Sequence, residues 1–338
     1  MTLIRAMSYD RFVRTLRIIL LLALAGGSLA AADWVVYEGG AGPGVGKHVV
    51  FMTGDEEYRS EEGMPMMAKI LAERHGFKCT VLFAIDPDTG EINPEVQTNI
   101  PNMEALDTAD LLVLFTRWRE LPDEQMKHFV EYYLRGGPIV ALRTATHPFR
   151  YSRNPESPYA KYHFRSAEWP GGFGQQVLGE TWVRHHGKHK FEGTRGLVDG
   201  MNRSHPILRG VEDVYGPTDV YEVVNLPADA TVLMHGMTTT GLEPSDPPKL
   251  DKSMMPIAWV RHYLNEAGRT NRIFTSTMGA SVDLLSEDLR RMIVNAVFWG
   301  LRMGVPERAN VDIIGDYEPI FFGFGDFAKG VKPAKYQE

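Results

Sequence analysis

The chain has 338 residues, of which 43% are hydrophobic and 10% aromatic, so it is long enough to bury a large core in one domain. Its formal net charge is −7, and its lysines and arginines form no basic stripe along the sequence. An acidic surface repels phosphate, so we expect no nucleic-acid partner. A single cysteine, Cys79, excludes an intramolecular disulfide, and the apolar sequence around it predicts a buried thiol in a strand.

Residues 1–32 have the features of a secretory signal peptide. Four arginines precede the apolar run 18–25, and small residues fill 26–32. An uncleaved membrane anchor is the weaker alternative, because so short a run cannot span roughly 30 Å of hydrocarbon. Removing this segment, with its four arginines and one aspartate, changes the formal charge from −7 to −10. We therefore expect an exported, periplasmic or extracellular protein with no membrane contact after cleavage.

The next part of the chain predicts two successive units of strand, helix and strand. Residues 33–46 are rich in glycine and are expected to be irregular. Near-continuous apolar runs predict strands, and apolar residues at helical spacing predict helices. In chain order these predicted elements are the strand 48–53, the helix 61–75, a strand around Cys79, the strand 111–115, the helix 123–135 and the strand 139–142.

Residues 148–217 show no long periodic element and are expected to form loops over one edge of the sheet. Regular elements resume with strands at 220–224, 231–235, 257–261 and 272–277 and a helix at 287–302. Alternating strands and helices predict a three-layer α/β sandwich around a mostly parallel, doubly wound sheet over residues 47–305. Residues 306–338 lack periodicity and are expected to pack outside as an extended arm.

The strand at 139–142 ends in a turn of small residues, with Arg143 at its apex. Open α/β sheets place their chemistry at such strand ends, and many enzymes carry a nucleophile there. An arginine cannot act as a base near neutral pH, but its fork of donors suits a carboxylate or a developing oxyanion. Arg143 and its neighbour Thr144 are therefore candidate substrate-binding residues. The alternative is that Arg143 pairs with an acidic neighbour such as Glu57 and holds loops together.

Two further loops follow strands at the same predicted edge. After the first strand, Glu57 is the candidate general base or hydroxyl acceptor, and Arg59 a candidate substrate-binding residue. The alternative for this acidic loop is a solvated helix N-terminus, which accounts for Glu61 and Glu62. After the strand 111–115, Arg117 and Trp118 offer an aromatic wall with hydrogen-bonding edges that suits a sugar ring.

Histidines gather in the loop-rich middle of the chain, which favours acid–base chemistry or a metal. His147 and His185 are the candidate acid–base residues. His185 and His189 lie on no convincing helix, no cysteine or aspartate completes a ligand set, and the spacing matches no zinc pattern. The sequence therefore assigns no cofactor and no metal ligand, and a bound metal remains the alternative that the ligand spacing does not support.

Residues 136–145 resemble the elbow of class I glutamine amidotransferases, with Arg143 at the position of the cysteine. Over almost all of residues 33–338 the chain is similar to the trehalose-utilisation ThuA-like family, which shares that fold. The resemblance rests on the acidic loop after the first strand, the elbow, Pro256-Ile257-Ala258-Trp259, and Arg272-Ile273-Phe274 followed by Met278-Gly279-Ala280. The family often has histidine where this chain has Arg143 and Ala280, so no histidine-based mechanism is carried over.

Glutamine hydrolysis is excluded, because it needs a thiolate poised by a histidine and this chain has neither at those positions. The resemblance implies a small-molecule carbohydrate partner and a role in carbohydrate utilisation. The expected activity is hydrolysis, lysis or isomerisation of a disaccharide or keto-sugar. Glu57 or His147 would transfer the proton, and Arg143 and Arg117 would bind the carbonyl or glycosidic oxygen of the sugar. The alternative is a non-catalytic sugar-binding or scaffolding protein on the same fold. The sequence does not fix the oligomeric state.

Overall fold

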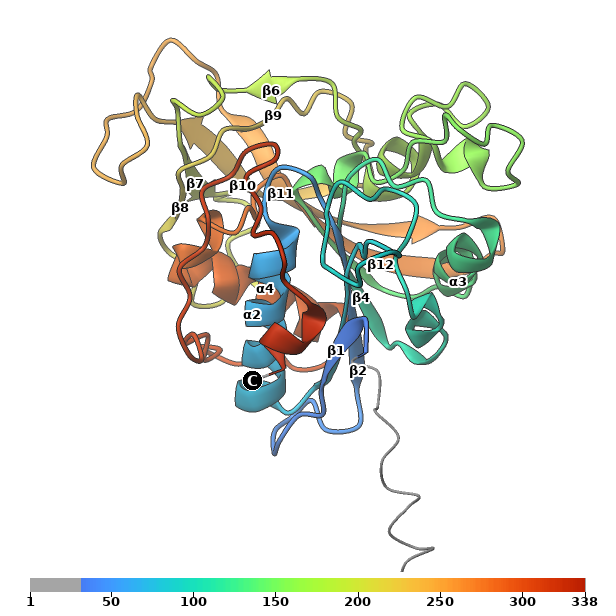
Figure 1. Ribbon diagram of the computed structural model, residues 1–338. Coiled ribbons are helices and arrows are strands. Elements are labelled where there is room, and N and C mark those ends of the chain that lie inside the picture. The colour runs from blue at the N-terminus through green and yellow to red at the C-terminus, as the bar shows by residue number, and fades with distance from the viewer. Residues whose placement is uncertain (1–31, 338) are drawn as a thin grey trace, which may run out of the picture. The chain divides into compact units, whose positions relative to one another are not determined.

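In the computed structural model, which describes residues 32–337, a ten-stranded sheet runs through the molecule (Figure 1). Its strand order is β1-β3-β2-β4-β5-β12-β11-β10-β7-β8, and β6 and β9 form a separate two-stranded ribbon. The strands are β1 Trp34–Tyr37, β2 His48–Gly54, β3 Lys78–Leu82, β4 Leu111–Thr116, β5 Ile139–Leu142, β6 His185–His186, β7 Thr194–Val198, β8 Val214–Gly216, β9 Val220–Tyr221, β10 Thr231–Thr238, β11 Met255–Leu264 and β12 Thr270–Ser276. The α-helices are α2 Ser60–His75, α3 Asp123–Leu134 and α4 Glu287–Gly300.

The five strands from β3 to β12 in the sheet order are mutually parallel, and every other pairing in the sheet is antiparallel. Side chains alternate along each strand, so each central strand contributes to both faces. Val49 and Phe51 pack in the core that α2 and α4 cover, whereas Val50 and Met52 pack in the core that α3 covers. The predicted α/β fold is confirmed, and its sheet is mixed around a parallel core.

Several short strands lie where loops were expected. Residues 33–46 are not wholly irregular, because β1 pairs antiparallel with β3 at the edge of the sheet. β7 and β8 add two more antiparallel strands within the segment 148–217. The strand expected at 220–224 ends at Tyr221 and pairs with β6 rather than with the main sheet. Each of these strands has five residues or fewer, too few to produce a clear hydrophobic period.

The proposed signal peptide falls on residues that lie outside the described ones, apart from Ala32. Within the described part of the chain, no helix has the length and apolar character needed to cross a membrane.

The C-terminal arm follows α4 and returns across the molecule without a strand, ending in a 3-10 turn at Pro333–Tyr336. The Gly323 N–H donates to the Glu57 carbonyl at 2.8 Å, and the Tyr37 hydroxyl donates to the Tyr336 carbonyl at 2.5 Å. The arm thus connects the loop after β2 with the edge strand β1.

The middle segment packs closely over the end of β5. A short π-helical turn at Gly174–Leu178 lies against the 3-10 turn Arg143–Thr146 that follows β5. A Cβ added at Gly174 would lie 1.8 Å from the Thr146 carbonyl oxygen, so only glycine permits this approach. This contact fixes the loops of residues 148–217 above the carboxyl ends of the parallel strands.

Replacing Gly174 by alanine should therefore lower the free energy of unfolding by at least about 1–3 kcal/mol, because the backbone must move to admit the methyl group. Urea unfolding followed by circular dichroism measures this loss. Gly304→Ala is the matched control, since a Cβ there meets no atom within 4 Å and Gly304 lies outside the left-handed region. Equal stability of the two variants would contradict the proposed close contact.

Candidate functional site

The carboxyl ends of the parallel strands carry the groups expected from the sequence. β2, β4 and β5 end at Gly54, Thr116 and Leu142, and each is followed at once by polar or charged residues. The loops of the middle segment and the C-terminal arm cover this edge.

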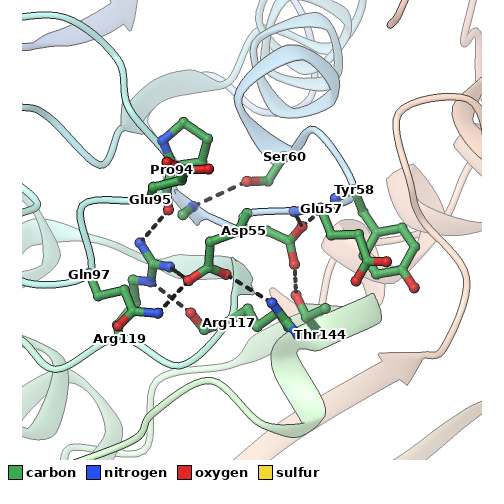
Figure 2. A network of polar contacts seen from close by, with 12 residues as sticks. Asp55, Glu57, Tyr58, Ser60, Pro94, Glu95, Gln97, Arg117, Arg119 and Thr144 are labelled. Carbon is green, nitrogen blue, oxygen red and sulfur yellow. Dashed lines mark hydrogen bonds and ion pairs between the residues drawn. The ribbon is translucent and has the colours of Figure 1, made fainter. Parts of the chain in front are cut away.

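Asp55 organises the loop after β2 (Figure 2). Its Oδ1 accepts hydrogen bonds from the backbone N–H groups of Glu57, at 2.8 Å, and Tyr58. Its Oδ2 accepts a hydrogen bond from the Thr144 hydroxyl at 2.6 Å. Asp55 and Thr144 are both fully buried. Thr144, expected to bind substrate, therefore joins the elbow to the loop after β2.

A second buried network surrounds Glu56, and Figure 2 labels its partners Gln97, Arg117 and Arg119. Its Oε1 accepts hydrogen bonds from Arg119 and, at 2.6 Å, from Gln97 Nε2. Burial raises the pKa of Glu56, and the charge of Arg119 opposes that shift. Arg117 lies 3.5 Å from the other oxygen, and its guanidinium stacks on the Trp118 ring at 3.7 Å. Arg117 and Trp118 are only partly buried, so both can face a ligand.

The structure does not bring Arg59 into the site. It has a left-handed backbone with φ 60°, and its buried guanidinium donates to the Gly323 carbonyl. Its Nη1 lies 3.6 Å from Glu61 Oε1. Arg59 was expected to bind substrate, but it is turned toward the C-terminal arm and holds that arm in place.

Arg143 occupies the apex of the elbow with φ 50°, and it is fully buried. Its guanidinium lies between the rings of Tyr58 and Tyr221, at 4.1 and 4.7 Å. Nη1 donates to the Thr277 carbonyl at 2.8 Å and to the Asp219 carbonyl. Because neighbouring loops enclose it, the Arg143 side chain has no solvent-exposed surface. Its acidic neighbour is Asp219, with Nη2 at 3.9 Å from Oδ1.

Four ionisable residues meet above Arg143, and we call them the histidine–carboxylate cluster: Glu57, His185, His189 and Asp219. His185 Nδ1 lies 2.5 Å from Asp219 Oδ2, and His189 Nδ1 lies 2.9 Å from Asp219 Oδ1. On its other side, His189 Nε2 lies 3.0 Å from Glu57 Oε1. The two carboxylates are buried, whereas the two imidazoles are about one-third exposed at 33% and 31%.

The contacts within the cluster determine its charge. Hydrogen bonds to Asp219 and Glu57 raise the pKa of His189 to about 9, so its imidazole is cationic at neutral pH in this arrangement. Burial alone would raise the pKa of Asp219, but the hydrogen bonds from His185 and His189 and the charge of Arg143 hold it well below its usual range. Asp219 is therefore ionised although it is fully buried.

The ribbon of β6 and β9 builds the cluster from distant parts of the chain. His185 pairs with Tyr221 across this ribbon, which places it beside Asp219. Gly187 has φ +128°, and a Cβ there would lie 2.7 Å from the Asp219 Cβ. The chain therefore crosses over Asp219 at Gly187 and brings His189 to its second oxygen.

His147 lies behind this cluster and is 2% exposed. Its ring packs among Trp118, Trp182 and Tyr221, with ring centroids 5.6–6.1 Å away. Burial lowers its pKa well below the ordinary value, and the charge of Arg117 adds to the shift. His147 is thus a neutral imidazole within an aromatic wall rather than an exposed acid–base group.

An open pocket of about 370 Å³ lies on the other side of that wall, and we call it the aromatic pocket. It is lined by Trp118, Arg150, Tyr151, Ser152, His163, Phe164, Arg165 and Trp182. The Trp182 ring lies 6.0 Å from the ring of His185 and so connects the pocket with the histidine–carboxylate cluster. A larger cavity of about 670 Å³ lies near the start of α4, but none of the cluster residues lines it.

The structure also groups residues that could hold a metal ion. His185, His189 and Asp219 each offer one ligand atom, and these atoms lie within 4.8 Å of one another. The sequence-based statement that no aspartate completes a ligand set is therefore wrong. The sequence gives no signal for Asp219, because it is 34 residues from His185 and belongs to no motif. An exposed group of the same size comprises Asp107, His128 and Glu131.

Comparison with known proteins was made by family, by sequence and by structure. Residues 48–300 match the model of the ThuA family, described as trehalose utilisation. A solved ThuA-like protein from Parabacteroides merdae has 14% identity and a TM-score of 0.50, covering 82% of this chain and 97% of its own, which supports the fold alone. Another from Bacteroides uniformis has 15% identity and a TM-score of 0.46, covering 78% and 94%. No curated protein matches the chain. The family match extends over most of the sequence, and this chain belongs to the ThuA trehalose-utilisation family.

Proposed function

We propose that this protein is exported and acts on a disaccharide or keto-sugar at the histidine–carboxylate cluster, with the sugar held in the aromatic pocket. The proposal rests on the position of Trp182, which lines the aromatic pocket and whose ring lies 6.0 Å from the ring of His185 in the histidine–carboxylate cluster. The family's link to trehalose utilisation supports a carbohydrate substrate.

The composition of the aromatic pocket suits a sugar. Trp118, Phe164 and Trp182 offer apolar faces for the C–H groups of a pyranose ring, and Arg150 and Arg165 offer hydrogen-bond donors for hydroxyl groups. Arg117 stacks on Trp118 at 3.7 Å and orients the indole ring. The pocket is an open cleft rather than a closed cavity, which is appropriate for a ligand of two rings.

The cluster supplies the groups that such a reaction needs. Hydrolysis, lysis and isomerisation of a sugar each require a proton to move to or from an oxygen or a carbon beside a carbonyl. Glu57 and the two imidazoles, each about one-third exposed, are the groups able to exchange protons there. Arg143 acts through Asp219, which it keeps ionised beneath the two histidines. Arg143 is therefore a positioning residue rather than a substrate ligand.

Trp118→Ala should weaken the binding of trehalose or of its 3-keto derivative by roughly two- to tenfold, since loss of an aromatic contact costs about 0.5–1.5 kcal/mol and 1.4 kcal/mol corresponds to tenfold. Isothermal titration calorimetry with each sugar measures the change. Trp169→Ala is the matched control, because Trp169 packs on Tyr162 and does not line the pocket. Undiminished binding by the Trp118 variant would exclude this pocket as the sugar site.

Glu57→Gln should lower kcat about 10²- to 10⁴-fold and leave the sugar Kd within about threefold, because the amide cannot accept a proton. Chromatographic detection of products from a panel of disaccharides and keto-sugars measures turnover. Glu62→Gln is the control, since the Glu62 carboxylate accepts the Ile320 N–H, away from the cluster. Full activity of the Glu57 variant would remove it from the chemistry. Binding without turnover by the wild type would favour the non-catalytic sugar-binding alternative.

Export has its own test, because it depends on residues 1–32 alone. A secreted or periplasmic product whose N-terminal sequence begins near residue 33 is the expected result. A chain recovered from the membrane fraction with Met1 intact would contradict cleavage.

A further inference from the structure

We infer that His185, His189 and Asp219 form a binding site for one divalent transition-metal ion. The inference refines the proposed function, because it makes the two imidazoles metal ligands rather than proton carriers. It rests on that proposal only for the site's relevance to catalysis, since metal binding can be measured without sugar.

The first support is the way in which the three side chains face one another. Asp219, when ionised, offers only lone pairs, and its two oxygens each face an Nδ1 atom at 2.5 and 2.9 Å. An imidazole nitrogen and a carboxylate oxygen approach this closely only with a proton or a cation between them. Both short nitrogen–oxygen distances involve the carboxylate of Asp219. A single divalent cation in place of the two bridging protons would leave the net charge of the group unchanged.

Glu57 supplies the second support. It lies 3.0 Å from His189 Nε2, the nitrogen on the opposite side of the ring from Asp219. A histidine that binds a metal through one nitrogen commonly donates the other N–H to a carboxylate, which fixes its tautomer and orientation. With the proton of His189 held at Nε2 by Glu57, the lone pair at Nδ1 points toward Asp219, where the metal ion would lie.

The dimensions of the group fit a metal ion. Ligand atoms on a tetrahedral ion with bonds of about 2.0–2.1 Å lie about 3.3 Å apart, so the two nitrogen–oxygen distances must lengthen by roughly 0.4–0.8 Å. Both histidines are about two-thirds buried and belong to a two-residue strand and the turn after it, which can accommodate so small a shift. Arg143 makes no hydrogen bond to the ligand atoms, because its Nη1 donates to the backbone carbonyl of Asp219 and its Nη2 lies 3.9 Å from Asp219 Oδ1, beyond hydrogen-bond distance.

The ligand types select the class of ion. Two imidazole nitrogens and one carboxylate favour zinc, iron or a similar first-row ion, whereas Mg²⁺ and Ca²⁺ prefer sites made of oxygen. Three protein ligands leave coordination positions free, which is typical of catalytic rather than structural sites. The His185 ring lies 6.0 Å from the ring of Trp182, which lines the aromatic pocket, so a sugar bound there would have an oxygen near such a position.

The test uses the untagged full chain, purified without chelators after expression under exporting conditions. Elemental analysis should find about one zinc, iron or similar ion per chain. After removal of metal by EDTA, calorimetry should show saturable binding of one Zn²⁺ or Co²⁺ and none of Mg²⁺. The visible spectrum of the Co²⁺ form should show the bands of a nitrogen-containing ligand set. That spectrum is recorded on the wild type and so does not depend on whether a variant folds.

His185→Ala and His189→Ala should each lower the affinity for Co²⁺ by roughly 100-fold or more, and Glu57→Gln by about 10–100-fold with the stoichiometry kept. His128→Ala, in the exposed group with Asp107 and Glu131, is the control and should change neither value. Absence of metal after purification together with no saturable binding would overturn the inference, as would unchanged binding in a folded His185 variant.

The two proposals fail separately. Metal binding without any sugar binding would overturn the proposed function and leave the metal site standing. Sugar turnover that is unaffected by complete removal of metal would leave the proposed function standing and overturn the metal site.

Discussion

The carboxylate of Asp219 is the group on which the rest of the site depends. It is fully buried, and an isolated ionised carboxylate in such a position would cost several kcal/mol of stability. Arg143 approaches it from below, and two imidazoles contact its oxygens from above. Arg143 comes from the elbow, His185 from β6 and His189 from the turn after β6, so the charge of Asp219 holds these three segments together.

This arrangement explains why an arginine can occupy the turn after β5, a position where many α/β enzymes carry a nucleophile. A side chain at the end of β5 is central to the carboxyl edge of the parallel strands, whatever its chemistry. The long guanidinium reaches two backbone carbonyls and the space between Tyr58 and Tyr221. The elbow thus supports the buried charge of Asp219, and the histidines of the histidine–carboxylate cluster contact that carboxylate rather than the apex of the elbow itself.

The sequence predicted the parallel core well, because strands buried on both faces are near-continuous apolar runs and their helices carry a clear period. It also located Glu57, Arg117 and Trp118 at the correct edge. It could not assign Asp219, a lone aspartate in a loop that approaches the histidines only because β6 and β9 pair. Nor could it show that Arg59 and Thr144 turn inward, since orientation at a strand end depends on local backbone angles and on which loops lie above.

The C-terminal arm makes the cluster dependent on the end of the chain. Phe322 stacks on Tyr58 at 5.3 Å and packs edge to face against His189 at 5.3 Å, and Gly323 bonds to the backbone of Glu57. Arg59 holds the same segment through the Gly323 carbonyl. These contacts position both ends of the Glu57–His189 pair and exclude water from one side of it, so electrostatic interactions within the cluster are stronger than they would be at an open surface. The arm is therefore part of the candidate site, although its sequence shows no motif and no periodicity.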